Sequence, residues 1–363
     1  MAVPTLEDLT ETALRWGPLR VTLSSSEEDV LSWVRACLHH DVDLAADPGT
    51  APAADTGVVV VDDALARTMA AACDGPVRDV DGVPVRSGTL DGIAVTTVEA
   101  RAWPMPLVLA RPDAETWWVV TGRGPLAPRA GEVLARQLLE RRLLELAAVP
   151  LHASSVALDG RAVLFLGDAG RGKTTLATWS AARLGGTLLS GDRTAVLRGG
   201  GSAPVAVGCA QSTRYRWGTI DALVGREGML RHLPGRHRML GDWPASVSAE
   251  LPPKVVLNNA ELAWLGVSVA ASAPLSAVVV LAEPVAGGPV VERVAPDELP
   301  RLLAPHGREP WLILPTYDAP PAATPRQLVA ALDGVPVLRA RWRPGMDDPA
   351  DVVGLVRQAA ALG

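Results

Sequence analysis

The stretch LFLGDAGRGKTTLA, residues 164–177, constrains the fold of this chain more than any other. Inside it, the run from Gly167 to Thr174 matches the pattern G-x-x-x-x-G-K-[ST]. Glycines allow backbone conformations and close approaches that other residues avoid. The backbone N–H groups of such a loop form an anion-binding nest at the N-terminus of a helix. An apolar run precedes the loop and a helical pattern follows it, so the sequence predicts a strand, a phosphate-binding loop and a helix.

The positions of this loop have expected roles in binding a nucleotide. Lys173 is expected to bridge the terminal phosphates, and the hydroxyl of Thr174 to ligate Mg²⁺. Lysine is rare here: of 34 basic residues only Lys173 and Lys254 are lysines, so a lysine in the loop suggests a need for a compact ammonium group. The predicted nucleotide contacts are Gly167, Asp168, Ala169, Gly170, Arg171, Gly172, Lys173, Thr174 and Thr175.

Length, charge and cysteine content favour a cytoplasmic protein with more than one domain. A chain of 363 residues is long enough for two or three domains. Its net charge of −6 gives no reason to expect nucleic acid or an anionic membrane as a partner. The N-terminus lacks the pattern of a secretory signal, and no apolar run reaches the roughly 20 residues that a membrane helix needs. Three scattered cysteines fit a reducing compartment.

The first 148 residues are predicted to form a separate α+β domain. A strand at 20–25 leads into a helix for which Ser25 and Glu28 are spaced as a capping box. The run VVVVDD is typical of a buried strand, and three later apolar runs indicate an antiparallel meander. Residues 127–148 predict an amphipathic helix that joins this domain to the next. Its expected apolar face comprises Leu134, Leu138, Leu139, Leu143 and Leu146.

Residues 149–363 are predicted to form a second domain around the phosphate-binding loop. Two strands on either side of Asp159-Gly160 indicate a β-hairpin, and the second strand leads directly into the loop. Two short strands are expected within GGTLLSGDRTAVLR, after the helix that follows the loop. Further strands at 276–283 and 335–342 and a C-terminal helix complete the domain.

A nucleotide site needs an acidic residue at the end of a neighbouring strand, and three places offer one. Asp62 and Asp63 lie far before the loop and are interpreted as a strand end and turn. Glu283 could position a metal or a water, although a plain central strand is the favoured interpretation. Asp192 lies 18 residues after Thr174, a gap that one helix and a short return would fill. We therefore select Asp192; the alternative is a turn aspartate before RTAVL.

His152 opens the hairpin strand that precedes the loop strand, 15 residues before Gly167. The turn at 159–160 folds that strand back, so the start of the strand is expected level with the loop. A histidine there can help to move a proton of the acceptor or contact a phosphate. Hairpin geometry by itself favours an ordinary strand histidine.

The segment LHASSVALDGRAVLFLGDAGRGKTTLATW, together with TLLSGDRTAVL, resembles the HPr kinase/phosphorylase family, in particular the HPr-kinase-related proteins of bacterial peptide-modification gene clusters. That family combines a histidine in a short strand, a hairpin, a Walker A loop and an acidic turn. The resemblance spans residues 149–198. It implies an α/β P-loop kinase core with a mixed sheet, the fold shared with ATP-dependent phosphoenolpyruvate carboxykinase, and it does not extend to the N-terminal α+β domain.

The resemblance implies a kinase that transfers the γ-phosphoryl group of ATP, with Mg²⁺, to a serine or threonine hydroxyl of a peptide or small protein. His152 matches the family's active-site histidine, Lys173 its phosphate lysine and Thr174 its metal hydroxyl. Asp192 matches the second aspartate of the acidic turn, which acts as general base, and would share the metal with Thr174. Gly191 replaces the first aspartate, and we cannot place the family's glutamate metal ligand in this sequence.

Arginines after Asp192 are candidates for contacts with an acidic acceptor or the transferred group. Arg193 adjoins Asp192, and Arg214 and Arg216 lie in the compact run RYRWG at the start of a basic segment, 214–238. A solvated arginine-rich surface is the alternative. Two other functions stay open, a small-molecule kinase and a non-catalytic nucleotide-binding module, which Gly191 would suit. The N-terminal domain would recruit a peptide substrate, and the sequence leaves a homo-oligomer open.

Overall fold

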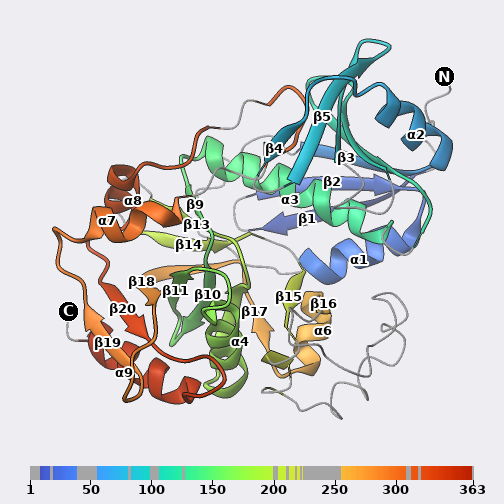
Figure 1. Ribbon diagram of the computed structural model, residues 1–363. Helices are drawn as coiled ribbons and strands as arrows, with labels where there is room; N and C mark the ends of the chain where they lie inside the picture. Colours follow the sequence, from blue (N-terminus) through green and yellow to red (C-terminus); the bar gives the residue numbers. More distant parts are fainter. Residues whose placement is uncertain are drawn as a thin grey trace. The chain divides into compact units, whose positions relative to one another are not determined.

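The computed structural model divides the chain into two compact units (Figure 1). The first comprises residues 1–145 with 309–321, and the second 146–308 with 322–363. The predicted boundary after residue 148 lies close to this division, but the return of 309–321 to the first unit was not expected. The structure describes residues 9–16, 19–38, 55–80, 83–98, 106–124, 127–198, 203–209, 212–216, 219–220, 223, 255–307, 312–317 and 320–361.

The first unit is built on an eight-stranded mixed sheet with the order β1-β2-β3-β8-β7-β6-β5-β4. The strands β2, β3 and β8 run parallel, and the other neighbours are antiparallel. The meander predicted from three apolar runs is confirmed as β6, β7 and β8. The strands are β1 (Thr10–Trp16), β2 (Leu19–Ser25), β3 (Asp55–Val61), β4 (Arg78–Val80), β5 (Val83–Leu90), β6 (Ile93–Val98), β7 (Leu107–Arg111) and β8 (Thr116–Thr121).

Helices cover both faces of this sheet, which explains the uninterrupted apolar run of β3. Val58 and Val60 pack with α2 (Asp63–Ala71), whereas Val59 lies on the face of α3 (Pro128–Glu145). A strand that is buried on both faces has no need of alternating polar residues. Asp62 caps α2 by accepting the N–H of Leu65, and so has a structural role, as expected.

Two expectations for the helices of the first unit are corrected. The helix α1 (Glu28–Leu38) has no capping box at Ser25, whose hydroxyl accepts the N–H of Glu27 instead. The helix α3 is not amphipathic, because it packs on α1 as well as on β2, β3 and β8 and buries polar residues such as Glu132 and Gln137. Leu146 lies beyond the end of α3 and is 39% exposed.

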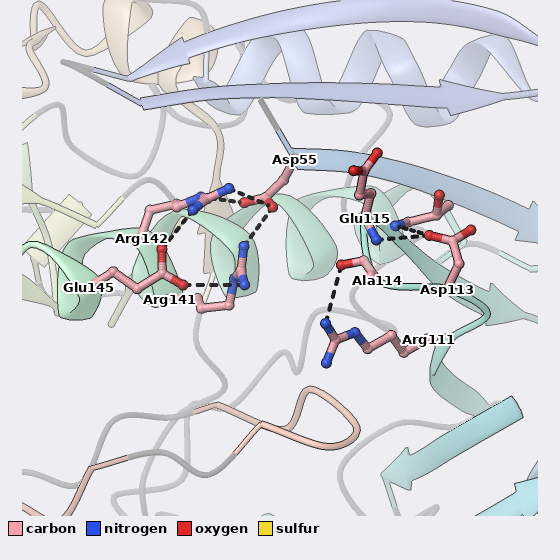
Figure 2. A network of polar contacts seen from close by, with 9 residues as sticks. Asp55, Arg111, Asp113, Ala114, Glu115, Arg141, Arg142 and Glu145 are labelled. Atoms are coloured by element: carbon pink, nitrogen blue, oxygen red, sulfur yellow. Dashed lines mark hydrogen bonds and ion pairs between the residues drawn. The ribbon is translucent and has the colours of Figure 1, made fainter. Parts of the chain in front are cut away.

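A buried ion-pair network ties the start of β3 to the end of α3 (Figure 2). The carboxylate of Asp55, 4% exposed, accepts from the guanidinium groups of Arg141 at 2.6 Å and Arg142 at 2.9 Å. Glu145 pairs with both arginines. Burial works against the charge of Arg142, but its bonds to Glu145 and Asp55 outweigh this and raise its pKa. Arg111 and Arg141 also lie over the Trp117 ring.

Removing the carboxylate at position 55 should strongly destabilise the chain. We expect Asp55→Ala to lower the free energy of unfolding by about 3 kcal/mol, because it removes the buried carboxylate that pairs with both half-buried guanidinium groups and leaves them only the more exposed Glu145. Chemical denaturation measures the change. The control is Glu28→Ala, which removes an ion pair with Arg35 whose side chains are 41% and 60% exposed and should cost about 1 kcal/mol or less. Equal losses in both variants would contradict the prediction.

The second unit is built on a mixed ten-stranded sheet with the phosphate-loop strand near its centre. The strands β11, β18 and β20 run parallel, and β10 and β12 continue the sheet beyond β11. The strands are β9 (Val149–Leu151), β10 (Ser154–Leu158), β11 (Arg161–Gly167), β12 (Thr187–Ser190), β13 (Thr194–Leu197), β14 (Val205–Gly208), β17 (Ser268–Val269), β18 (Ser272–Ala282), β19 (Val290–Arg293) and β20 (Val337–Arg341). A separate pair is formed by β15 (Thr213–Tyr215) and β16 (Val255–Leu257).

Helices cover both faces of the second sheet as well. Phe165 of β11 packs in a core with α4 (Lys173–Arg183) and α9 (Pro349–Ala361), whereas its neighbours Leu164 and Leu166 face α7 (Leu299–Leu303) and α8 (Pro325–Ala331). The short helices α6 (Asn259–Trp264) and η3 (Ala304–His306) also belong to this unit. In the part of the chain described above, no helix is long and apolar enough to span a membrane.

The predicted hairpin is confirmed. Leu158 pairs with Arg161 across the turn, and Asp159 and Gly160 have φ values of 52° and 75°. This is the left-handed backbone that a two-residue hairpin turn requires, and Asp-Gly adopts it readily.

Candidate functional site

The phosphate-binding loop connects the end of β11 to the start of α4. The strand β11 ends at Gly167, and α4 begins at Lys173. Gly170 and Gly172 have φ values of 85° and 87°, a left-handed backbone that favours glycine. Gly172 is the N-cap of α4 and makes no side-chain cap. The N–H groups of the first turn of α4 therefore lack the side-chain acceptor that caps many helices, and they fit an anion.

The first two residues of α4, Lys173 and Thr174, are hydrogen-bonded to backbone carbonyl oxygens around the loop. Lys173, 8% exposed, donates from Nζ to the carbonyl oxygens of Gly167 at 2.6 Å and Asp168 at 3.2 Å. Thr174 Oγ1 donates to the carbonyl oxygen of Gly191 at 2.8 Å. Ser154 Oγ donates to the same carbonyl oxygen at 2.6 Å and lies 3.3 Å from Thr174 Oγ1. The threonine of the loop is thus joined directly to the turn that carries Asp192.

The sheet brings His152 and Asp192 together. The strand β12 pairs with β10, and β13 pairs with β9. The turn between β12 and β13 therefore lies beside the two-residue connection, 152–153, between β9 and β10. Asp192 lies in that turn, and His152 lies in that connection. His152 therefore precedes the hairpin strand, whereas the sequence predicted that it would be the first residue of that strand. His152 Nε2 lies 3.0 Å from Asp192 Oδ1, and the turn is fixed by Ser190 Oγ, which accepts the N–H groups of residues 192 and 193.

Asp192 is held in its ionised form. Burial opposes the charge of this carboxyl group, but the hydrogen bond and charge of His152, with the charges of Arg193 and Arg214, outweigh it and lower the pKa of Asp192 to about 2. An aspartate with this pKa is a carboxylate throughout the physiological pH range. It can therefore accept a hydrogen bond from an acceptor hydroxyl without first losing a proton.

The low pKa of Asp192 should depend on its histidine partner. In His152→Ala we expect the pKa of Asp192 to rise from about 2 toward its ordinary value, because the hydrogen bond from His152, the largest contribution that lowers this pKa, is lost. A carboxyl-carbon NMR titration measures this change. Asp113, in the other unit, has a pKa lowered mainly by the backbone N–H of Glu115 and serves as the internal reference, since it should not move. An unchanged Asp192 titration would contradict the assignment of the shift to His152.

The packing around Gly191 explains why no aspartate stands there. A Cβ atom at this position would lie 2.2 Å from Thr213 Cγ2 and 2.9 Å from Thr213 Oγ1. Thr213 begins β15 and is itself buried, so it has little room to move. Gly191 instead contributes its carbonyl oxygen, which accepts the hydroxyls of Thr174 and Ser154.

Introducing an aspartate at position 191 should destabilise the fold for steric reasons. We expect Gly191→Asp to lower the free energy of unfolding by about 1–3 kcal/mol, because its Cβ overlaps Thr213. Denaturant titration measures the loss, and adding Thr213→Ala should recover much of it by removing the two closest atoms. The control is Gly354→Asp, where no atom lies within 4 Å of the new Cβ. If Gly191→Asp alone is as stable as the unchanged chain, this interpretation is wrong.

The three predicted arginines lie near the same site. The charges of Arg193 and Arg214 act on Asp192, which places both guanidinium groups in its neighbourhood. Arg216 NH1 lies 4.0 Å from the Cβ position of Gly170 in the loop. The hydroxyl groups of Thr175 and Thr219 form a hydrogen bond of 2.9 Å. The other arginines of the basic segment, Arg226, Arg231, Arg236 and Arg238, lie outside the described residues, as does Lys254.

The oxygen donors at the site fit Mg²⁺ that is bound together with a nucleotide. Thr174 and Asp192 offer a hydroxyl and a carboxylate, the hard ligands that Mg²⁺ takes, and this ion usually keeps waters and substrate phosphates as its other ligands. Within the described ranges, no group of three or more His, Cys, Asp or Glu side chains could hold a metal.

Two residues of this region were not selected from the sequence. Ser154 lies in an ordinary-looking strand, and nothing in the sequence indicates its bond to Gly191. Trp342 donates from its indole N–H to the carbonyl oxygen of Arg171 at 2.9 Å, although 171 residues separate them. Glu283, interpreted above as the end of a plain strand, follows β18 and forms an ion pair with Arg171.

Comparisons with known proteins were made for the whole chain. No protein-family model matches it, and no curated protein matches it. Among solved structures, the chain is similar to the HPr(Ser) kinase/phosphatase from Coxiella burnetii, with 12% sequence identity and a TM-score of 0.30. The match covers 59% of this chain and 91% of that chain. A likeness this distant assigns neither a fold nor an activity to this chain.

Proposed function

We propose that this protein is an ATP-dependent phosphotransferase that moves the γ-phosphoryl group to a serine or threonine hydroxyl of a peptide or small protein. One observation carries the proposal: the phosphate-binding loop and the His152–Asp192 pair lie at one edge of the same sheet, joined by the bond from Thr174 to Gly191. A nucleotide-binding module needs the loop and a carboxylate for its metal, whereas a histidine hydrogen-bonded to that carboxylate is typical of a site that handles a proton. The pair supports transfer to an acceptor hydroxyl.

The residues of the site suggest how the transfer would proceed. The oxygen of the acceptor hydroxyl forms a bond to the γ-phosphorus while the bond from that phosphorus to the bridging oxygen of ADP breaks. Asp192 accepts the hydroxyl proton, and His152 keeps Asp192 in place. A carboxylate with a pKa of about 2 is a weak base, which suits a transition state that needs little proton removal before the phosphoryl group departs. When bound, Mg²⁺ would neutralise phosphate charge.

The charges near Asp192 favour an acidic peptide as the acceptor. Arg193, Arg214 and Arg216 gather at the edge of the site, and the side chains of Arg214 and Arg216 are exposed. Guanidinium groups in such a position can hold carboxylates by paired hydrogen bonds. A short peptide encoded next to this gene is therefore the first acceptor to try, in line with the resemblance to kinases of peptide-modification clusters.

Intact-mass measurement separates the candidate functions. The chain is incubated with Mg²⁺, ATP and the neighbouring peptide, and transfer adds about 80 Da to the peptide. The gain should disappear in Asp192→Asn. Transfer to a metabolite but to no peptide would favour a small-molecule kinase. Tight ATP binding without transfer to any acceptor would overturn the proposal and favour a non-catalytic module.

A further inference from the structure

We propose that Trp342 is a positioning residue for nucleotide binding, which holds the peptide bond between Arg171 and Gly172 so that the start of α4 faces the phosphates. This inference rests on the proposed nucleotide-binding function of the loop. It adds a residue from the far end of the chain, because Trp342 directly follows β20.

The indole contacts the loop in two ways. Its N–H group donates to the carbonyl oxygen of Arg171 at 2.9 Å. Its ring lies against Gly172, where a Cβ atom would be 2.2 Å from Cζ2 and 3.1 Å from Cε2 of Trp342. Gly172 is thus required for close approach to the ring as well as for its positive φ. A hydrogen bond and a flat contact surface together define the orientation of this peptide bond.

The tryptophan is itself held firmly. Trp342 is 2% exposed and belongs to the core formed with Val352, Val353 and Val356 of α9. The strand before it pairs in parallel with β18, and β18 pairs in parallel with β11. Because parallel strands end at the same edge of a sheet, the ends of β20 and β18 lie next to the loop that leaves β11.

Arg171 is also held by its side chain. The guanidinium group forms an ion pair with Glu283, the residue that follows β18. The Arg171 residue is therefore fixed at its carbonyl group by the end of one strand and at its side chain by the end of another. The Glu283 side chain is 78% exposed, so its contribution should be small. The buried contact with Trp342 carries most of the effect.

A loop that is arranged before its ligand arrives binds more tightly, since less conformational freedom is lost on binding. Trp342 is hydrogen-bonded to the loop, whereas the residues proposed for the transfer step, His152 and Asp192, are paired with each other. The inference therefore predicts weaker nucleotide binding with little change in the maximal rate.

The test is Trp342→Phe, which keeps an aromatic ring and removes the indole N–H donor. Isothermal titration with Mg²⁺ and ATP should show a dissociation constant about five- to tenfold higher, the size expected for one lost hydrogen bond. The KM for ATP should rise by a similar factor while kcat stays within about twofold. Trp264→Phe makes the same chemical change at a tryptophan of this unit that is 52% exposed, and should leave both constants unchanged.

The outcomes distinguish this inference from the proposed function. If the unchanged chain transfers phosphate and Trp342→Phe binds ATP equally well, the positioning role is wrong and the function stands. If the unchanged chain binds ATP without transfer, the function is wrong, and weaker binding by Trp342→Phe still supports the positioning role. If the unchanged chain does not bind ATP at all, both proposals fail. A lower unfolding temperature in Trp342→Phe with normal binding would show a purely structural role and overturn the inference.

Discussion

Replacing Lys173 by alanine should reduce phosphoryl transfer roughly a thousandfold or more. Lys173 lies almost fully inside the site, and its ammonium group is held between the carbonyl oxygens of Gly167 and Asp168. A charge in such a sheltered place acts on a phosphate far more strongly than one in water. Initial rates of peptide phosphorylation, with ATP binding by titration, measure the loss.

Two further variants sharpen the test of Lys173. Lys173→Arg should restore little activity, because a planar guanidinium group needs more room than the buried ammonium group leaves. Arg161→Ala removes an exposed cation from the opposite end of β11 and should keep nearly full activity. Substantial transfer by Lys173→Ala would sink the assignment of this loop to ATP.

Replacing Asp192 by asparagine should separate binding from transfer. We expect the transfer rate to fall about 10²- to 10⁴-fold, because asparagine cannot take the hydroxyl proton. The affinity for ATP without Mg²⁺ should change only a few-fold, since the loop, Lys173 and the start of α4 remain in place. Single-turnover kinetics with the peptide, beside ATP titration, measure the two effects separately.

The matched control for Asp192 is Asp159→Asn, at the other end of the hairpin. The Asp159 side chain is 84% exposed and pairs with Arg357, and asparagine tolerates the same left-handed backbone. This variant should transfer phosphate normally. If Asp192→Asn retained full transfer, the carboxylate would have no role in proton transfer, and His152 would be the next candidate.

The pKa of Asp192 also fixes the direction of one pH effect. Its folded pKa of about 2 lies below the ordinary value of about 4, so the ionised carboxylate stabilises the fold above that ordinary value. This contribution is lost only as the pH falls toward about 2. Loss of transfer between pH 7 and pH 5 would therefore report a group other than Asp192.

The sequence determined the local parts of this protein. The glycines and Lys173 define the loop between β11 and α4, and Asp159-Gly160 defines the hairpin turn, because each depends on the backbone preferences of a few consecutive residues. The hairpin also predicted that His152 would lie level with the loop. The prediction of an amphipathic α3 was wrong, because neighbours on more than one side of this helix bury its polar residues.

The tertiary structure alone decided how these parts meet. The contact of Asp192 with His152 follows from two strand pairings, β12 with β10 and β13 with β9, that no local pattern states. The need for a glycine at position 191 follows from Thr213, which packs against it in the folded chain. The hydrogen bond from Trp342 to the loop joins residues that are far apart in the sequence. Side-chain packing and sheet register act between segments, whereas turns, loops and caps are governed by neighbours in sequence.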